Sequence, residues 1–331
     1  MEYPFIRKQR ILSESDLQIP YKALLRWRTQ GISLLIPVYT LLNEMSQTAD
    51  TTLIDDTRLM ALNPDADEFE EKTISGRMWG KTDNKTFAVF DYASNWKASF
   101  LDSFVDKFIG ILVGDGYGGY PGFAEKHGLE GLAGCNDHAR RKFAEASLLR
   151  DAKANEVLEI FETIYRVERD ANNEKVDDDE RKRRRNTDAR PAFEKLRAMM
   201  NEVQNAYSAK STMSRAITYF LRNYDRLTLY LDNGNVPIST APLERMIRSV
   251  AKVRKDSLFV GSIGIGKLLA INVSLMLSCE LAGICYYKYL LDVLPKLSGT
   301  DFPAARLDEL LPDQWAKLRG IGRYGPKSAA A

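Results

Sequence analysis

The sequence predicts an α/β protein in which helices cover a mixed β-sheet. Two observations support this fold class. Between residues 51 and 139, short apolar or β-branched stretches alternate with segments whose apolar residues recur at helical spacing, which is typical of a sheet packed against helices. Residues 140–231, in contrast, contain almost no strand pattern and predict a helical insertion. With 331 residues, of which 44% are hydrophobic, the chain is long enough to form two or three structural units.

The N-terminal region, residues 1–48, is predicted to be helical. Helices are expected at 5–12, 21–27 and 32–45, with a polar break at 13–18. This spacing fits a helix-turn-helix, in which Lys22, Arg26 and Arg28 would face DNA phosphates. A helical hairpin packed on the next domain explains the same pattern equally well.

Residues 49–139 are predicted to form the first part of the sheet domain. Strands are expected at 51–62, 77–80, 86–92, 109–113 and 131–135. The turn residues 82–85 join the second and third strands as in a hairpin, and apolar residues between 98 and 108 recur at helical spacing. Further helices are expected at 123–126 and from Ala139 onward.

The rest of the chain is predicted to be mainly helical. Residues 140–236 form the insertion, within which the charged run 177–185 is typical of a solvated turn between long helices. Residues 237–297 return to the core with a helix that starts near Thr240 and Pro242, followed by a buried helix over 268–287. That second helix contains Asn272 and Glu280, which favour a core helix over a membrane span. Residues 298–331 are expected to be a tail, flexible beyond Arg319.

Composition limits the function classes. Lys and Arg total 47 against 45 Asp and Glu, so the net charge of +2 does not by itself predict a nucleic-acid partner, and any such surface must come from local clustering. Three cysteines without repeated spacing cannot build a disulfide framework, and residues 1–10 do not resemble a signal peptide. We therefore expect a cytoplasmic protein with no membrane partner.

Three acidic residues are tied to particular predicted elements. Asp55 lies in the first strand, Asp115 follows the fourth, and Glu244 lies on a late helix. If the first and fourth strands are neighbours, both aspartates project toward one edge of the sheet. Carboxylates that converge repel one another unless they bind protons or cations, and Mg²⁺ prefers carboxylate oxygens. Alternatively, Asp115 caps an Asp-Gly turn and the other two are ordinary surface acids.

Several sequence motifs are more specific than the spacing of the three acids. They are LIDDT (53–57), DGYGGY (115–120), CNDHARRKF (135–143), ERMIR (244–248), RKDSLF (254–259) with GS (261–262), and LLP (310–312). In their identity and order they closely resemble the insertion sequence 66 transposases, from about Tyr3 almost to the C-terminus. The resemblance implies an RNase H-like catalytic core with a helical insertion before the last acid. It also implies DDE-type DNA cleavage and strand transfer that depend on Mg²⁺, for which Mn²⁺ can substitute.

The same resemblance implies the site residues and partners. Asp55, Asp115 and Glu244 match the family's catalytic, metal-binding acids. The implied partners are DNA (element ends and target), further copies of the chain in a homo-oligomer, and accessory proteins of the element. Family members also carry an upstream coiled-coil-like helix and a zinc-finger-like segment, which this chain is expected to lack.

Basic residues near the acids are candidate DNA-binding residues. They are His138, Arg140, Arg141, Lys142, Arg245, Arg248, Lys252, Arg254 and Lys255. Glu244, Arg248 and Lys252 recur every four residues and share one helix face, which is also the pattern of a ladder of surface ion pairs. Cys135 and His138 could be half of a zinc site, but no second pair accompanies them, and Cys135 is predicted to be a buried strand end.

Two other functions remain open. One is an RNase H-like nuclease that cleaves without strand transfer. The other is an inactive copy that only binds DNA, which is favoured by two departures from the family's motifs. Ser239-Thr240-Ala241 stands where members commonly have Asp-Asn-Asn, and Asp256-Ser257 stands where they have Asn-Trp.

Overall fold

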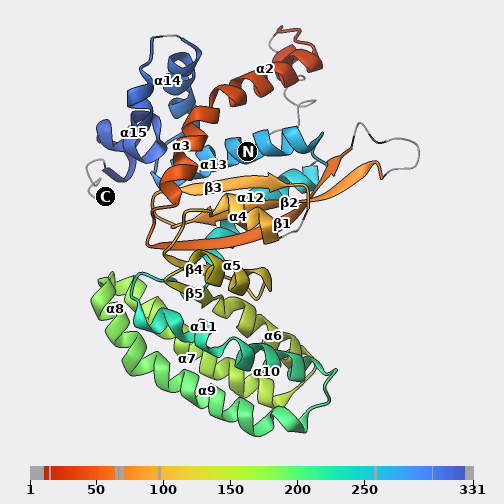
Figure 1. Cartoon of the computed structure of the whole chain (residues 1–331), viewed down its shortest axis with the longest axis vertical. Helices are drawn as coiled ribbons and strands as arrows, with labels where there is room; N and C mark the ends of the chain where they lie inside the picture. Colours follow the sequence, from red (N-terminus) through yellow and green to blue (C-terminus); the bar gives the residue numbers. More distant parts are fainter. Residues whose placement is uncertain are drawn as a thin grey trace. The chain divides into compact units, whose positions relative to one another are not determined.

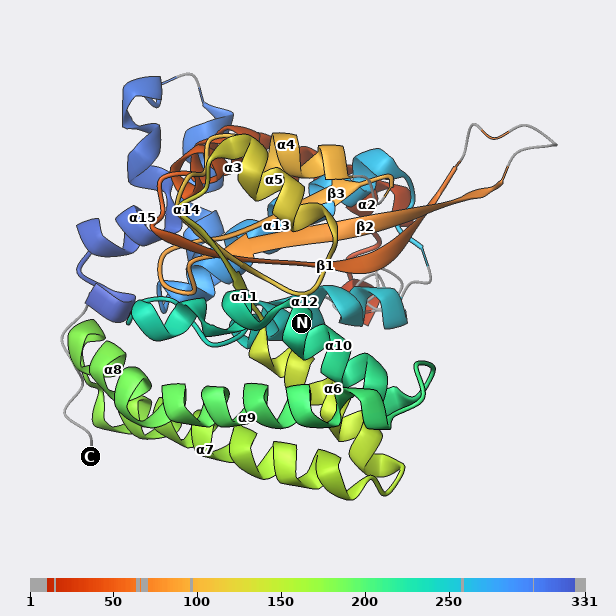
Figure 2. The same cartoon turned by 60° about the horizontal axis from the view of Figure 1, so that its bottom comes forward.

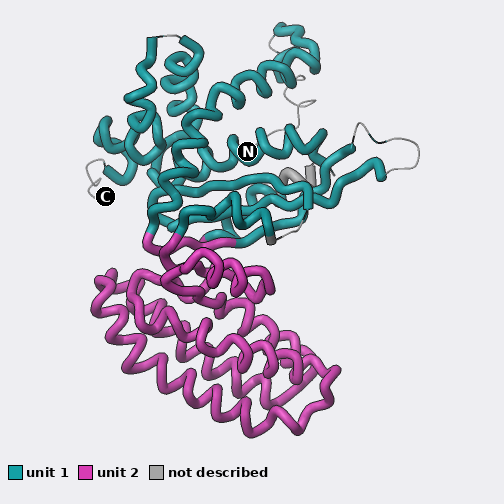
Figure 3. Tube along the Cα trace, viewed as in Figure 1, with its two compact units in different colours: residues 1–49, 55–108, 243–331 teal, residues 50–54, 109–242 magenta. Residues whose placement is uncertain are grey.

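The computed structural model (Figure 1) describes residues 11–14, 16–63, 66, 71–95, 98–256, 259–299 and 301–324, with only the backbone described at 98 and 252–256. The chain divides into two compact units (Figure 3). Unit 1 comprises residues 1–49, 55–108 and 243–331, and unit 2 comprises residues 50–54 and 109–242. The unit boundaries fall inside one strand and one helix, so both elements begin in unit 2 and continue in unit 1.

Five strands form one sheet in the order β3-β2-β1-β4-β5. They are β1 (Thr51–Leu62), β2 (Thr73–Thr82), β3 (Ala88–Ala93), β4 (Ile111–Gly114) and β5 (Gly131–Gly134). β3 pairs with β2 in antiparallel fashion, whereas β4 is parallel to both β1 and β5. The mixed sheet with helices confirms the predicted α/β class. All five predicted strands are present, although β4 begins two residues later than expected and β2 begins four residues earlier.

Unit 1 contains the N-terminal and C-terminal helices. Its elements are α2 (Tyr21–Leu34), α3 (Ile36–Ser46), η1 (Ala98–Phe100), α4 (Leu101–Phe104), α13 (Ile263–Leu281), α14 (Tyr286–Ser298), η5 (Ala304–Leu310), α15 (Pro312–Leu318) and η6 (Gly322–Tyr324). The helix α12 (Ala241–Asp256) begins at the end of unit 2.

The N-terminal helices differ from the prediction. The segment 28–31, expected to separate two helices, is helical, and the break lies at Leu35. A one-residue link differs from the three or four residues of a helix-turn-helix turn. Since α2 contacts α13 and α14 while α3 contacts β3, the helices pack on the sheet of unit 1, as the alternative interpretation expected. Of the predicted first helix and polar break, residues 11–14 are helical, and residues 5–10 lie outside the described residues.

The helix α13 runs along the edge strand β3 (Figure 1). Its hydroxyl groups replace a neighbouring strand: the N–H of Ala88 donates to Ser278 Oγ at 3.0 Å, and the N–H of Phe90 donates to Ser274 Oγ at 2.8 Å. The two serines are four residues apart and therefore lie on one face of the helix. Buried backbone groups of β3 are thus satisfied by side chains.

The helix α13 is long and apolar enough to cross a membrane by length and composition, and 56% of its most apolar window is buried in the protein. Its packing on β3 makes it the core helix that the sequence predicts. It ends earlier than expected, at Leu281, because Gly283 adopts a left-handed conformation (φ 70°) and the N–H of Ile284 returns to the carbonyl of Cys279.

The predicted C-terminal tail is folded over residues 304–324. Trp315 in α15 is buried, and its indole N–H donates to Asp292 of α14 at 2.8 Å. The N–H of Arg323 donates to the carbonyl of Ala282. Residues 325–331 lie outside the described residues.

Unit 2 joins the start of β1 and the strands β4 and β5 to a helical layer. Its helical elements are α5 (Gly119–His127), α6 (Asn136–Leu148), α7 (Ala152–Glu174), α8 (Asp178–Arg184), η2 (Arg185–Ala189), α9 (Arg190–Val203), η3 (Gln204–Ala206), α10 (Thr212–Arg222), α11 (Tyr224–Thr228) and η4 (Leu229–Asp232). Figure 2 shows α7 and α9 side by side, with α8 connecting them. The residues between β5 and α12 are therefore mainly helical, as predicted.

The charged run 177–185 is mostly exposed, as expected, but it is helical and not a turn, so that part of the prediction is wrong. Asp177 accepts the N–H of Glu180 at 2.8 Å and caps α8. Arg185, the last residue of the run, is 1% exposed and pairs with Glu168 of α7, with 2.6 Å between Nε and Oε1. The run therefore starts a helix and ends in the core of unit 2.

Unit 1 contains a buried lysine that makes stability depend on pH. Lys81 of β2 is fully buried, and its Nζ donates to the carbonyl of Phe104 at 2.6 Å. Burial lowers the pKa of Lys81 to about 7, an effect that the nearby Asp106 and Asp91 partly offset. Since the unfolded side chain has a pKa near its usual value of about 10.4, the unfolded chain binds more protons above pH 7.

We therefore expect the free energy of unfolding to rise with pH between about 7 and 8.5, by up to ~1.4 kcal/mol per pH unit from this group. Lys81→Met should remove that rise. The measurement is urea unfolding of the wild type, Lys81→Met and the exposed control Lys107→Met at several pH values in this window. Parallel curves for wild type and Lys81→Met would contradict the assignment.

Candidate active site

Two of the predicted site residues, Asp55 and Asp115, lie in β1 and directly after β4. In unit 2, β1 pairs Leu53 with Val113 of β4, and β4 pairs Val113 with Ala133 of β5. Each of these paired residues is followed, two positions later, by a residue of interest. These residues are Asp55, Asp115 and Cys135. The parallel register thus assigns these three residues equivalent positions on successive strands or just beyond their ends.

Asp115 is partly exposed and begins a tight turn after β4. Its Oδ1 accepts the N–H of Tyr117 at 2.8 Å, which is an Asx turn. Its backbone carbonyl accepts a hydrogen bond from Arg226 Nη2 of α11 at 3.1 Å. Both the side chain and the backbone of Asp115 are therefore held, while Oδ2 carries no hydrogen bond from the described residues.

Asp55 lies within β1, beside a second aspartate. Its Oδ1 accepts the N–H of Asp56 at 2.8 Å. Asp56 forms an ion pair with Arg77 of β2, with 2.6 Å between Oδ2 and Nη1. Because successive side chains of a strand point to opposite faces, Asp55 projects away from this ion pair. Asp56 is therefore paired across the sheet with β2.

The segment before α12 is fastened to the end of β5. Asn136 Nδ2 donates to the carbonyls of Leu227 and Ile238 at 3.0 and 3.2 Å. Cys135 Sγ accepts the N–H and the hydroxyl of Thr240 at 3.4 and 3.2 Å. Burial raises the pKa of the Cys135 thiol to about 11, so the thiol is protonated at neutral pH. Cys135 is fully buried directly after β5, which confirms its predicted place.

Glu244 lies in the first turn of α12, one helical turn beyond Thr240. It is partly exposed, whereas Leu243, Ile247 and Val250 of the same helix are buried. Arg245 and Arg248 are exposed. The side chains of Lys252, Arg254 and Lys255 lie outside the described residues.

The basic residues of α6 point in different directions. Lys142 Nζ lies over the ring of Tyr219 of α10, 4.8 Å from its centroid. Arg140 interacts electrostatically with Glu162 of α7, whose pKa is lowered chiefly by Arg169. Arg140 and Arg141 are exposed and His138 is partly exposed. Residues 138, 141 and 142 share one face of α6, whereas Arg140 belongs to another.

Three of the predicted site residues offer carboxylate oxygens to a metal ion. Asp55, Asp115 and Glu244 supply hard oxygen ligands of the kind that Mg²⁺ prefers. Cys135, in contrast, is engaged by Thr240 through a neutral thiol. Carboxylates of this kind suit a magnesium site, whereas a thiolate zinc site would require Cys135 to lose its proton.

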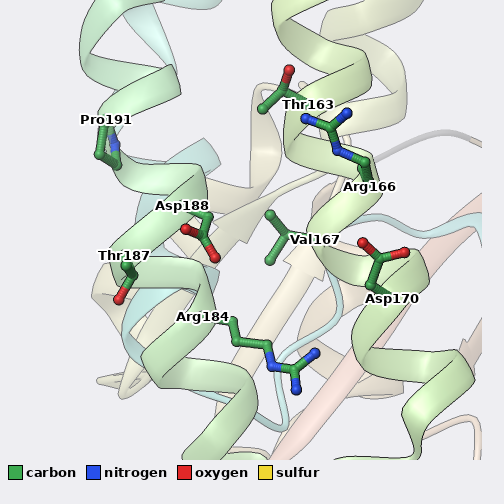
Figure 4. Close-up of a pocket in the computed structure, with 8 residues that line it drawn as sticks. All are labelled: Thr163, Arg166, Val167, Asp170, Arg184, Thr187, Asp188 and Pro191. Carbon is green, nitrogen blue, oxygen red and sulfur yellow. The ribbon is translucent and has the colours of Figure 1, made fainter.

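A pocket of about 400 Å³ lies elsewhere in unit 2, between α7 and the segment from α8 to α9 (Figure 4). Its walls carry two arginines and two aspartates around Val167: Arg166, Arg184, Asp170 and Asp188. Arg184 is already paired with Glu174 and Glu180. None of the predicted site residues lines this pocket, and its mixed charges do not select one ligand class.

Two residues near Asp115 were missed from the sequence. Arg226 bonds to the Asp115 carbonyl, and the Tyr219 ring lies so close to Gly116 that a Cβ there would come within 2.5 Å of it. Both come from the helical insertion, more than 100 residues after Asp115. The printed sequence carries no motif that links them to the aspartate.

Residues 1–267 match the family model described as Transposase IS66 family. The chain is 28% identical over 323 residues to the uncharacterized protein y4jD of Sinorhizobium fredii (strain NBRC 101917 / NGR234), covering 94% of this chain and 63% of that protein. It is 27% identical over 307 residues to y4hP of the same organism, covering 86% and 54%. The chain thus spans about three fifths of the length of these relatives.

Proposed function

The chain belongs to the IS66 family of transposases, and from this premise we propose that it cuts and joins DNA by a metal-dependent, DDE-type reaction. The acids of the proposed site are Asp55, Asp115 and Glu244. The proposed substrates are the ends of a mobile element and the target DNA. Copies of the chain would act as a homo-oligomer on paired ends, with or without accessory proteins of the element.

The proposed catalytic core is RNase H-like. The strand order β3-β2-β1-β4-β5, with an antiparallel half and a parallel half, supports this assignment. So does the helical stretch between β5 and α12, which separates the first two acids from the third.

The register of β1 and β4 is the observation that carries the proposal. With Leu53 opposite Val113, Asp55 and Asp115 occupy equivalent positions in neighbouring parallel strands. Thr240, whose N–H and hydroxyl bond to Cys135, directly precedes the helix α12, and we propose Glu244 in the first turn of that helix as the third acid. Three acids distant in sequence then serve one site.

In this site the three carboxylates would hold divalent metal ions, which when bound activate the attacking oxygen and stabilise the leaving 3′ oxygen. In the first step, water attacks a phosphodiester phosphorus and a 3′-hydroxyl leaves. In the second, that hydroxyl attacks a phosphorus of the target and displaces another 3′ oxygen. No side chain needs to form a covalent intermediate.

The basic residues near the acids in sequence are the proposed DNA contacts. Arg141, Lys142 and His138 follow β5 on one face of α6, and Arg248 shares the α12 face of Glu244. Phosphate contacts of this kind fix the DNA without reading its sequence. Arg140, Arg245, Lys252, Arg254 and Lys255 complete the proposed set.

The test is cleavage of a supercoiled plasmid that carries the DNA flanking this chain's coding sequence on both sides. We expect nicking by the full chain in Mg²⁺, none in EDTA, and recovery in Mn²⁺, because the carboxylates cannot polarise the phosphate without a cation. A precleaved end with a 3′-hydroxyl should then be joined to a second plasmid.

The alternatives give different results. Metal-dependent nicking without joining of precleaved ends would identify a nuclease instead of a transposase. DNA binding that persists while neither metal supports nicking or joining would identify a non-enzymatic DNA binder. Ser239-Thr240-Ala241, which lies directly before α12, is the feature that favours this last outcome.

A further inference from the structure

The turn that carries Asp115 is clamped by two residues of the helical insertion. We infer that Arg226 and Tyr219 are positioning residues, which fix this turn in the conformation that binds metal. The inference rests on the proposed function, and all the contacts that support it lie within unit 2.

The first contact is made by the guanidinium group of Arg226. Nη2 donates to the Asp115 carbonyl at 3.1 Å, and Nη1 donates to Asn223 Oδ1 at 3.2 Å. Asn223 in turn donates to the carbonyl of Tyr219 at 2.8 Å. Arg226 therefore connects the Asp115 backbone to the end of α10.

The burial of Arg226 costs folding free energy, which a purely structural contact would not require. Its Nε is buried and has no hydrogen-bond partner among the described residues. Burial also lowers the pKa of Arg226, although the guanidinium remains charged. A buried donor without a partner destabilises a fold. Proteins keep such unsatisfied buried donors mainly where function requires them.

The second contact is steric. Tyr219 covers Gly116, where an added Cβ would lie 2.5 Å from the Cε2 atom of the ring. The ring is held in turn by Lys142, which lies 4.8 Å from its centroid. A side chain at position 116 must therefore displace either the ring or the turn.

Together the two contacts leave the turn little freedom. Arg226 holds the carbonyl of Asp115, Tyr219 closes the space over Gly116, and the N–H of Tyr117 orients Asp115 Oδ1. Residues that orient metal ligands typically change metal affinity by about 10- to 100-fold when they are removed. The insertion thus does more than extend the molecule: it sets the affinity of the site for its cation.

The test is Mn²⁺ binding to the full chain, measured by electron paramagnetic resonance, together with the Mg²⁺ concentration that gives half-maximal plasmid nicking. We expect Arg226→Met to weaken Mn²⁺ binding and raise the Mg²⁺ requirement about tenfold, with much of the maximal rate recovered at high Mg²⁺. Arg226→Lys, which keeps a donor, should lie between Arg226→Met and the wild type. Gly116→Ala, whose added Cβ must displace the Tyr219 ring or the turn, should also weaken Mn²⁺ binding and raise the Mg²⁺ requirement.

The controls separate this inference from the proposed function. Arg215→Met removes an exposed arginine of α10 and should leave both measurements unchanged. If Asp115→Asn leaves Mn²⁺ binding intact, the proposed function fails. If Asp115→Asn weakens binding while Arg226→Met and Gly116→Ala match Arg215→Met, only the positioning role is overturned. Thermal unfolding of each variant shows whether a loss of Mn²⁺ binding is caused by misfolding. If Arg226→Met misfolds, the comparison of Arg226→Lys with the wild type tests the positioning role instead.

Discussion

Asp115→Asn is expected to lower the rate of DNA nicking about a thousandfold at saturating Mg²⁺, while DNA binding is retained. Asparagine has nearly the shape of aspartate and can still accept the N–H of Tyr117, so the turn after β4 should persist. What is lost is the negative charge that would hold a divalent cation. The measurement is single-turnover nicking of the plasmid described above, with filter binding of the same DNA.

The matched control for this change is Asp225→Asn. Asp225 lies in unit 2 on α11 and is exposed, so its replacement removes one charge without touching the turn at Asp115. It should nick DNA at nearly the wild-type rate. Equal rates for Asp115→Asn and the wild type would remove Asp115 from the chemistry, and with it the proposed active site.

Arg185→Met is expected to destabilise unit 2 by about 3–5 kcal/mol. The Arg185 side chain is 1% exposed, and its Nε and Nη2 meet the two carboxylate oxygens of Glu168 at 2.6 and 2.9 Å. Nη1 also donates to the carbonyls of Tyr230 and Asn233. Methionine fills a similar volume but leaves the Glu168 carboxylate with only its longer contact to Arg181, at 3.3 Å. The measurement is urea unfolding followed by circular dichroism.

Two further variants show whether burial is the cause. Arg183→Met removes an arginine of the same run whose side chain is 63% exposed and pairs with Glu180 on the surface, so the unfolding midpoint should hardly move. Glu168→Met combined with Arg185→Met should recover part of the loss, because no buried charge is left unpaired. A single Arg185→Met variant as stable as Arg183→Met would contradict this account.

Much of the sheet could be predicted because its signals are local. The hairpin between β2 and β3 is an example: Asp83 Oδ1 accepts the N–H groups of Lys85, Thr86 and Phe87, which are two to four residues away. The N-terminal helices were predicted less well: the break expected at residues 28–31 lies inside α2, and α3 begins at Ile36 with Pro37 in its first turn.

The features that the sequence did not predict depend on contacts between residues that lie far apart in the chain. Arg185 looks like part of a solvated run until Glu168 and the carbonyl of Tyr230 surround it. The candidate acids could be found because Asp115 begins a recognisable motif after a strand. Their supports could not, since Arg226 lies 111 residues from Asp115 and Thr240 lies 105 residues from Cys135.

The serine hydroxyls that cover β3 also restrict how copies of this chain can assemble. An edge strand with open N–H groups is a template on which a strand from another molecule can extend the sheet. Here Ser274 and Ser278 already occupy the N–H groups of Phe90 and Ala88. A partner cannot join by strand addition along this edge unless α13 first detaches. The β3 edge is therefore protected from strand exchange between copies of the chain and from fibrous aggregation.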